Sequence, residues 1–93
     1  MFPSDQRLTL DTNRAIWREI GDEVVVLDAT TATYLSLNAS ARTLWKRLDD
    51  GATPTDLAAE LMAAYGIPAA QAKSDVADFL VALDERLLLL PSE

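Results

Sequence analysis

The side chains of this chain that could carry chemistry are mostly carboxylates, and their spacing does not assemble a reactive centre. There are 15 Asp and Glu residues, but no His and no Cys. Asp49 and Asp50, like the acidic residues between positions 75 and 85, lack the spacing of a twelve-residue calcium loop. A transition-metal site is not expected without His or Cys, and three glycines form no phosphate-binding loop. We therefore expect a protein that is not an enzyme and that holds no metal or cofactor.

The backbone of one short segment is a second source of binding chemistry. Residues 33–37 place Leu35 and Leu37 on one face of a strand and Tyr34 and Ser36 on the other. The segment contains no Lys, no Pro and no charged residue, which are the residues that usually protect an edge strand. At a sheet edge, its free N–H and C=O groups could pair with an extended peptide. The alternative is an edge covered by the chain's own N-terminus or by a second copy in a dimer.

A helical pattern near the C-terminus offers side chains that could complete such a site. At about 100° per residue, the residues along one flank of its apolar stripe are Ala72, Asp75, Phe79, Ala82 and Arg86. The small residues leave space beside Phe79, and Asp75 could bind a basic or polar residue of a peptide. The opposite flank is an equally shaped competitor and holds Lys73, Ala77, Val81 and Asp84. A solvated helix face is the simpler interpretation of Asp75 and Asp78 taken alone.

Three strand patterns and three helix patterns would position these groups. Residues 15–20 and 23–28 are predicted strands joined by a tight turn at Gly21 and Asp22, and residues 33–37 form the third strand. The segment 23–28 is apolar on both faces, so we expect a central strand that is covered on both sides. Strands followed by helices predict an α+β fold. The predicted elements are those of a winged helix-turn-helix-like domain, in which a three-stranded antiparallel sheet is followed by three helices. We expect the third strand at an edge of this sheet.

The helix boundaries have local signals. Asn38 is a good N-cap for the first helix, and Thr53, Pro54 and Asp56 begin the second. Gly66 ends the second helix. The third helix opens at Pro68, and its apolar stripe is Val76, Phe79, Leu80, Leu83 and Leu87.

The segments outside these helices and strands have less definite patterns. Residues 1–12 are either flexible or place Leu8 and Leu10 under the sheet. Residues 88–90 are predicted to cross the core as an extended segment. Trp45 lies on an apolar helical stripe and is predicted to be core, whereas the pattern around Trp17 fits the core and the surface equally well.

Composition narrows the class of partner. A chain of 93 residues suits a single domain, residues 1–93. The net charge of −7 repels phosphate backbones and anionic lipids, so we expect neither nucleic acid nor membrane as a partner. A DNA-binding regulator of winged-helix type is the less favoured alternative, because the third helix meets Asp75 and Asp78 soon after its one Lys. A small structural or dimerisation subunit is another alternative. The absence of Cys is compatible with a cytoplasmic protein.

Four segments of the chain resemble a known family. The residues that carry the resemblance are 23–28 (EVVVLD), 34–38 (YLSLN), 44–51 (LWKRLDDG) and 75–83 (DVADFLVAL), and the resemblance extends over residues 14–90. Their order and spacing resemble the PqqD-like peptide chaperones, the recognition elements of ribosomally made, post-translationally modified peptides. The Tyr-x-x-Leu-Asn stretch and the length look most like the recognition protein of lasso-peptide pathways. One departure is that Arg86 precedes Leu87 where the family often has Gly, which puts the C-terminal turn in doubt.

The resemblance implies a function and a place for it. In that family the leader of a precursor peptide adds as a strand beside the third strand and lies against the third helix. The implied partners are the leader, a transglutaminase-like cysteine leader peptidase and an asparagine-synthetase-like cyclase. The alternative within the family is a chaperone that presents its peptide to a radical-SAM enzyme. The peptide-binding residues that follow from the matched positions and their neighbours are Thr33, Tyr34, Leu35, Ser36, Leu37, Ala72, Asp75, Val76, Phe79 and Ala82.

Overall fold

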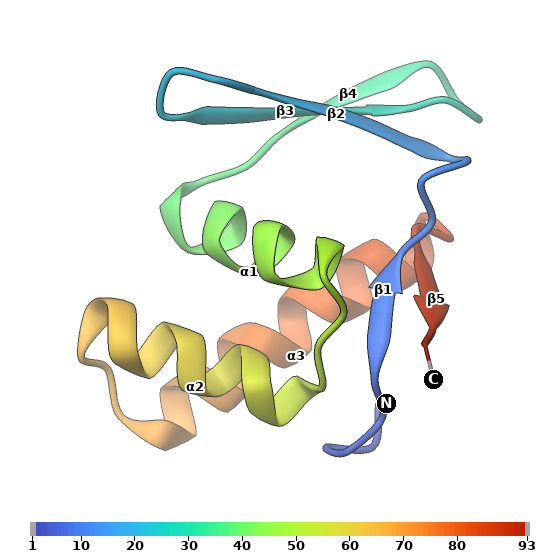
Figure 1. Cartoon of the computed structure of the whole chain (residues 1–93). Helices are drawn as coiled ribbons and strands as arrows, with labels where there is room; N and C mark the ends of the chain where they lie inside the picture. The colour runs from blue at the N-terminus through green and yellow to red at the C-terminus, as the bar shows by residue number, and fades with distance from the viewer. Residues whose placement is uncertain (1, 93) are drawn as a thin grey trace.

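The structure of the protein is a computed structural model in which residues 2–92 are described, so both ends of the predicted domain, Met1 and Glu93, lie outside the described residues. A sheet lies over a layer of helices, and two short strands run side by side at one end (Figure 1). This confirms the predicted α+β fold with a three-stranded antiparallel sheet followed by three helices. In chain order the elements are β1 (Leu8–Leu10), β2 (Ala15–Ile20), β3 (Glu23–Asp28), β4 (Thr33–Ser36), α1 (Ala39–Asp49), α2 (Pro54–Tyr65), α3 (Ala69–Glu85) and β5 (Leu89–Pro91).

The three-stranded sheet has the order β2-β3-β4, so β3 is central as predicted. Val26 of β3 is opposite Trp17 on one side and Leu35 on the other, and both pairs of strands are antiparallel. The turn between β2 and β3 uses Gly21 at φ +60°, a conformation that glycine adopts without steric penalty. The sheet therefore ends at β4 on one side and at β2 on the other.

The N-terminal segment joins a separate sheet. β1 pairs antiparallel with β5, with Thr9 opposite Leu90. Leu8 and Leu10 are buried, so they are packed into the fold and are not a flexible end, but the predicted place under the sheet is wrong. These side chains pack beside α1 and β5 and not under the three-stranded sheet. The C-terminal segment is extended as predicted, at Leu89–Pro91, but only its start is buried and Leu90 is 41% exposed, so it does not cross the core. Its pairing with β1 was not predicted.

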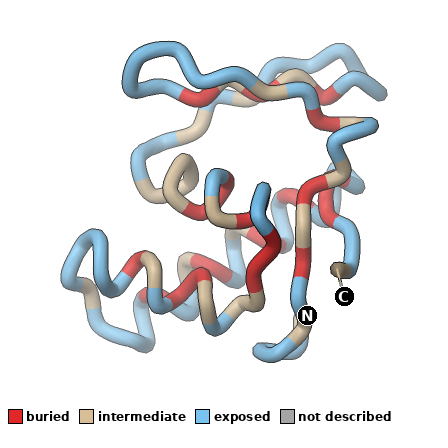
Figure 2. The backbone as a smooth tube through the Cα atoms, in the orientation of Figure 1, coloured by how far each residue is buried: buried red, intermediate tan, exposed pale blue. Residues whose placement is uncertain are grey.

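The prediction that β3 is covered on both faces is wrong. Val24 and Val26 are buried on the face toward the helices, while Val25 and Leu27 on the other face are only half-buried. Figure 2 shows buried positions along the sheet where it faces the helices. Within residues 2–92 no helix or loop packs over the second face, because all three helices lie on the same side of the sheet. An apolar run can thus occur in a strand that has only one covered face.

The helices begin and end at the predicted residues. Asn38 caps α1, where its Oδ1 accepts a hydrogen bond from the backbone N of Ala41 at 2.9 Å. Gly66 ends α2 in the left-handed region at φ +63°. Trp45 of α1 is fully buried, as predicted, and its ring meets that of Trp17 edge-on with centroids 6.3 Å apart. Trp17 is half-buried and lies opposite the buried Val26, so it belongs to the face of the sheet that packs on the helices.

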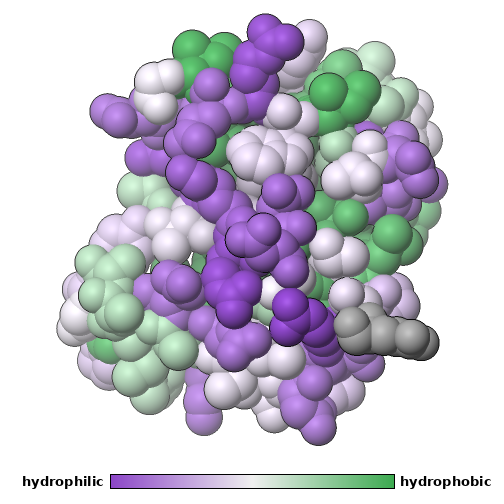
Figure 3. All heavy atoms as spheres, viewed as in Figure 1, coloured by the Kyte–Doolittle hydropathy of each residue, from purple (hydrophilic) through white to green (hydrophobic). Residues whose placement is uncertain are grey.

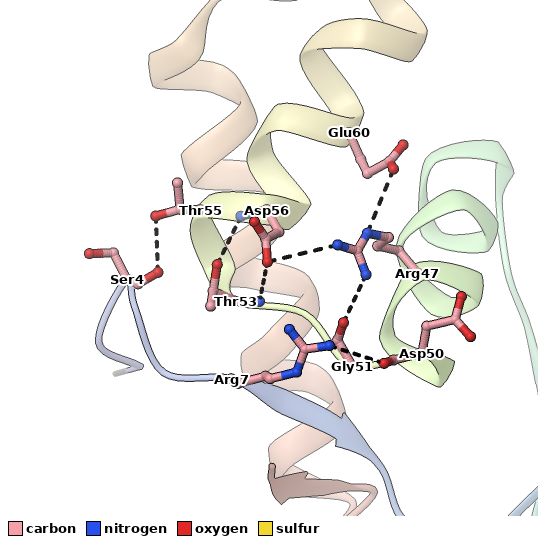
Figure 4. A network of polar contacts seen from close by, with 9 residues as sticks. All are labelled: Ser4, Arg7, Arg47, Asp50, Gly51, Thr53, Thr55, Asp56 and Glu60. Atoms are coloured by element: carbon pink, nitrogen blue, oxygen red, sulfur yellow. Dashed lines mark hydrogen bonds and ion pairs between the residues drawn. The ribbon is translucent and has the colours of Figure 1, made fainter. Parts of the chain in front are cut away.

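A polar network fixes the turn between α1 and α2 (Figure 4). The guanidinium of Arg47 donates to the carbonyl of Gly51 at 2.8 Å and lies 3.8 Å from Asp56 and 3.7 Å from Glu60. Asp56 Oδ2 accepts from the backbone N of Thr53 at 3.1 Å, and Thr53 Oγ1 accepts from the backbone N of Asp56 at 3.0 Å. These bonds to Thr53, assisted by the positive charge of Arg47, lower the pKa of Asp56 below its ordinary value.

Leu87 does not continue the apolar stripe of α3, contrary to the prediction. It lies past the end of the helix at φ +59° and is 59% exposed. The backbone N of Leu88 donates to the carbonyl of Leu83 at 3.0 Å, and the backbone N of Leu87 donates to that of Asp84 at 2.9 Å. This pair of bonds is the Schellman motif, in which the residue after the C-cap, here Leu87, takes the left-handed conformation. The turn that usually contains glycine therefore forms here with leucine, and it directs Leu88 into the core.

Candidate peptide-binding site

β4 has one free edge. No strand pairs with its outer side anywhere in residues 2–92, because the sheet order is β2-β3-β4 and β1 pairs with β5. Alternate residues of an antiparallel edge strand direct both their N–H and their C=O away from the sheet. The predicted edge position of the third strand is therefore confirmed, and the N-terminal segment is excluded as its cover. The edge of β2 is also free, but that strand contains the charged residues Arg18 and Glu19.

A hollow of about 370 Å³ lies where β4 leads into α1. A two-residue coil, Leu37 and Asn38, connects β4 to α1, so the first turn of α1 follows shortly after the free strand (Figure 1). We call this the α1–α3 hollow, because all of its residues lie on α1 or α3 except the N-cap Asn38 and Leu61 of α2. Its lining consists of Asn38, Ser40, Ala41, Leu44, Leu61, Asp75, Asp78 and Phe79.

The α1–α3 hollow has an apolar base and a polar rim. Leu44 and Leu61 are buried beneath it, and Phe79 is half-buried in its wall. On the rim, Asn38 Oδ1 accepts from the hydroxyl of Ser40 at 3.1 Å, so Asn38 is held in place by α1. The ion pairs found between described residues leave out Asp75 and Asp78. The hollow is thus suited to a side chain with an apolar body and a polar or cationic end.

The strand residues of the predicted site differ in what they expose. Thr33, Tyr34 and Ser36 are exposed, and Tyr34 is 70% accessible. Leu35 and Leu37 are half-buried and pack against the core. None of the five lines the α1–α3 hollow. A peptide paired with β4 would therefore meet the backbone of these residues first.

The helix residues of the predicted site also fall into groups. Asp75 and Phe79 line the hollow, whereas Ala72 and Val76 are 0% and 2% exposed and belong to the core. Ala82 is exposed but lies outside the hollow. The competing flank of α3 contributes nothing to the hollow and is exposed throughout; its residues are Lys73, Ala77, Val81 and Asp84. The hollow therefore lies on the flank of Asp75 and Phe79.

Several residues of the hollow were not singled out as site residues in the sequence. Asn38 was recognised only as a helix cap, and Leu44 only within the segment 44–51 that carries the family resemblance. Leu61 comes from a third element, α2, Ala41 belongs to the same apolar stripe as Trp45, and Ser40 carries no distinctive pattern. A usable signal did exist for Asn38: a cap that directly follows an edge strand must lie at the end of that strand.

Comparison with known proteins now adds to this geometry. Residues 23–89 match the family model described as coenzyme PQQ synthesis protein D (PqqD). The chain belongs to the PqqD family. No curated protein sequence matches it.

Two solved structures resemble this PqqD-family chain. One, described as TbiB1 in complex with the TbiA(beta) leader peptide, is 31% identical, has a TM-score of 0.80, and covers 87% of this chain and 93% of its own. The other, described as lasso peptide synthetase B1 complexed with the leader peptide, is 28% identical, has a TM-score of 0.78, and covers 90% of this chain and 98% of its own. The family resemblance seen in the sequence is thereby confirmed. In residues 2–92 we find no helix long and apolar enough to cross a membrane.

Proposed function

We propose that this chain binds the leader of a ribosomally made precursor peptide in lasso-peptide biosynthesis. The leader adds as a strand to the free edge of β4 and inserts a side chain into the α1–α3 hollow. The observation that carries the proposal is the free, uncharged edge of β4 beside a hollow that is lined by Asp75 and Phe79. The two similar solved structures support it, since both are complexes with a leader peptide.

Different parts of the site supply affinity and selectivity. Backbone hydrogen bonds along β4 hold any extended peptide, because every residue except proline offers the same N–H and C=O groups. Selectivity then comes from side chains that meet Tyr34 on the sheet or enter the hollow beside Phe79. Ala72 and Val76 support that wall from within the core, and Ala82 lies further along α3.

The chain acts as an adaptor and performs no chemistry itself. Holding a leader raises the effective concentration of the attached peptide near a partner enzyme. The partners we propose are a transglutaminase-like cysteine leader peptidase and, less directly, an asparagine-synthetase-like cyclase, all in the cytoplasm. A second candidate function, presentation of a peptide to a radical-SAM enzyme, is favoured by the match to the model of PqqD.

The test changes the peptide and leaves the protein unaltered, so that the folding of the protein is not affected. A fluorescein-labelled leader is titrated with the chain, and binding is followed by fluorescence anisotropy. Two further leaders carry N-methyl groups on alternate residues, one on the odd and one on the even positions. Since alternate N–H groups face β4, we expect one set to weaken binding by at least about tenfold and the other to have little effect. Equal effects of the two sets would contradict strand addition.

The same titration separates the alternatives for the partner. Absence of saturable binding to the leader encoded with this chain would refute the proposed function. Tight binding to a leader whose gene neighbours a radical-SAM enzyme, and not to a lasso-peptide leader, would favour the second candidate.

A further inference from the structure

The outer face of the three-stranded sheet, which has no cover in residues 2–92, is apolar. Ile16, Leu27 and Tyr34 are opposite one another in the register and form a row across all three strands. The exposed fractions are 57% for Ile16, 59% for Ile20 and 70% for Tyr34. A shallow hollow of about 400 Å³ lies on this face. In the space-filling view, hydrophobic atoms reach the rim of the molecule over the sheet (Figure 3). We call Ile16, Ile20, Val25, Leu27 and Tyr34 the outer-face patch.

Such a face needs a partner. An antiparallel sheet with one face on a core usually alternates apolar residues inward with polar residues outward. Here five of the eight outward positions are β-branched, leucine or tyrosine, and the other three are Arg18, Glu23 and Ser36. Contiguous exposed apolar surface on a small protein marks an interaction site.

The charge of the chain favours a different protein over a second copy. Each copy has a net charge of −7, so the pairing of two copies is opposed by charge repulsion. The hairpin end of the patch carries Asp22 and Glu23, which would favour Lys or Arg on the facing surface. The complementary partner therefore presents an apolar surface with a basic rim.

The position of the patch indicates which kind of protein docks on it. β4 takes part in two surfaces, because its free edge is the proposed peptide site and its outward residue Tyr34 belongs to the patch. A peptide strand added to β4 extends the same sheet, and its alternate side chains then lie on the outer face beside Tyr34. A protein docked on the patch would contact the receptor and the bound peptide together. The best fit to this arrangement is an enzyme that acts on the peptide.

We propose that the outer-face patch docks the leader peptidase, through an apolar surface rimmed by Lys or Arg. This inference rests on the proposed function, since it assumes that the peptide adds to β4. It goes further by assigning the enzyme to a surface distinct from the α1–α3 hollow: the two share no residue.

The test uses two double variants of equal charge. The sheet variant is Ile16→Lys with Ile20→Lys, which the fold should tolerate because both side chains are largely exposed and Lys is common on edge strands. The control variant is Met62→Lys with Val81→Lys, at exposed helix positions of 39% and 46%. Both are titrated with the fluorescein-labelled leader and, separately, with the purified leader peptidase of the same pathway.

We expect the sheet variant to bind the peptidase at least about tenfold more weakly than the wild type, and the control variant to bind it within about twofold. Both variants should bind the leader as the wild type does. Unchanged peptidase binding by the sheet variant, with leader binding intact, would overturn the docking surface alone. A wild-type dimer in light scattering that the sheet variant converts to a monomer would overturn it too, in favour of a second copy. Failure of the wild type to bind the leader would instead refute the proposed function, and this inference with it.

Discussion

Replacing Phe79 by Ala is the most informative change in the proposed peptide site. Phe79 is half-buried, packs against the core with one part of its ring and lines the α1–α3 hollow with the rest. Removing a fully buried Phe costs about 3–5 kcal/mol of stability, so a half-buried one should cost roughly 2 kcal/mol. If the exposed part of the ring is a central contact for the leader, its loss should weaken binding by about 2 kcal/mol, or roughly 30-fold.

The assay is the anisotropy titration with labelled leader, together with urea unfolding of the same samples. Unfolding cannot imitate the expected loss, because even 3 kcal/mol of remaining unfolding free energy leaves less than about 1% of the molecules unfolded. Val81→Ala is the matched control on the opposite flank of α3, where the side chain is exposed and outside the hollow. It should change leader affinity by less than about twofold.

If Phe79→Ala is folded and binds the leader within about twofold of the wild type, the hollow is not part of the binding site. A larger effect of Val81→Ala than of Phe79→Ala would place the site on the other flank of α3.

Three further predictions concern stability. Leu87→Gly should raise the unfolding free energy by about 1 kcal/mol, because Leu87 is held at φ +59° and left-handed backbone costs non-glycine residues about 1–2 kcal/mol. Thermal melts measure the change, with Leu87→Ala as the control, and an equal gain in stability from Leu87→Ala would contradict the explanation. Thr53→Ala should lower the unfolding free energy by about 1 kcal/mol, because the variant loses the N-cap of α2. Urea unfolding measures this loss, and an unfolding midpoint equal to that of the wild type would contradict it. Folding lowers the pKa of Asp56, so its carboxylate adds stability that is complete above the ordinary Asp pKa and is lost as the pH falls through the lower folded value. The difference in unfolding free energy between the wild type and Asp56→Asn should therefore shrink over that acidic range. A difference that grows as the pH falls would contradict the lowered pKa.

The prediction of β4 as an open edge needed both local and non-local information. Alternation of Leu35 and Leu37 with Tyr34 and Ser36 identified the strand, and the lack of charge suggested a usable edge. Whether the edge is free depended on β1, which could have paired there. Its actual partner, β5, lies some eighty residues away in the chain, at Leu89–Pro91, and no local pattern specifies such a pairing.

Features that depend on near neighbours in the chain could be predicted from the sequence. Asn38, Thr53 and Gly66 set helix ends through bonds to groups within four residues, and the strand periods identified which side chains share a face. Tertiary structure alone decided which of those faces are covered. All three helices pack on one side of the sheet, which leaves Val25 and Leu27 half-exposed in a strand that looks fully buried in sequence. The hollow likewise exists because Leu61 and Phe79, from different helices, meet the start of α1, and packing between distant segments is a property of the whole chain.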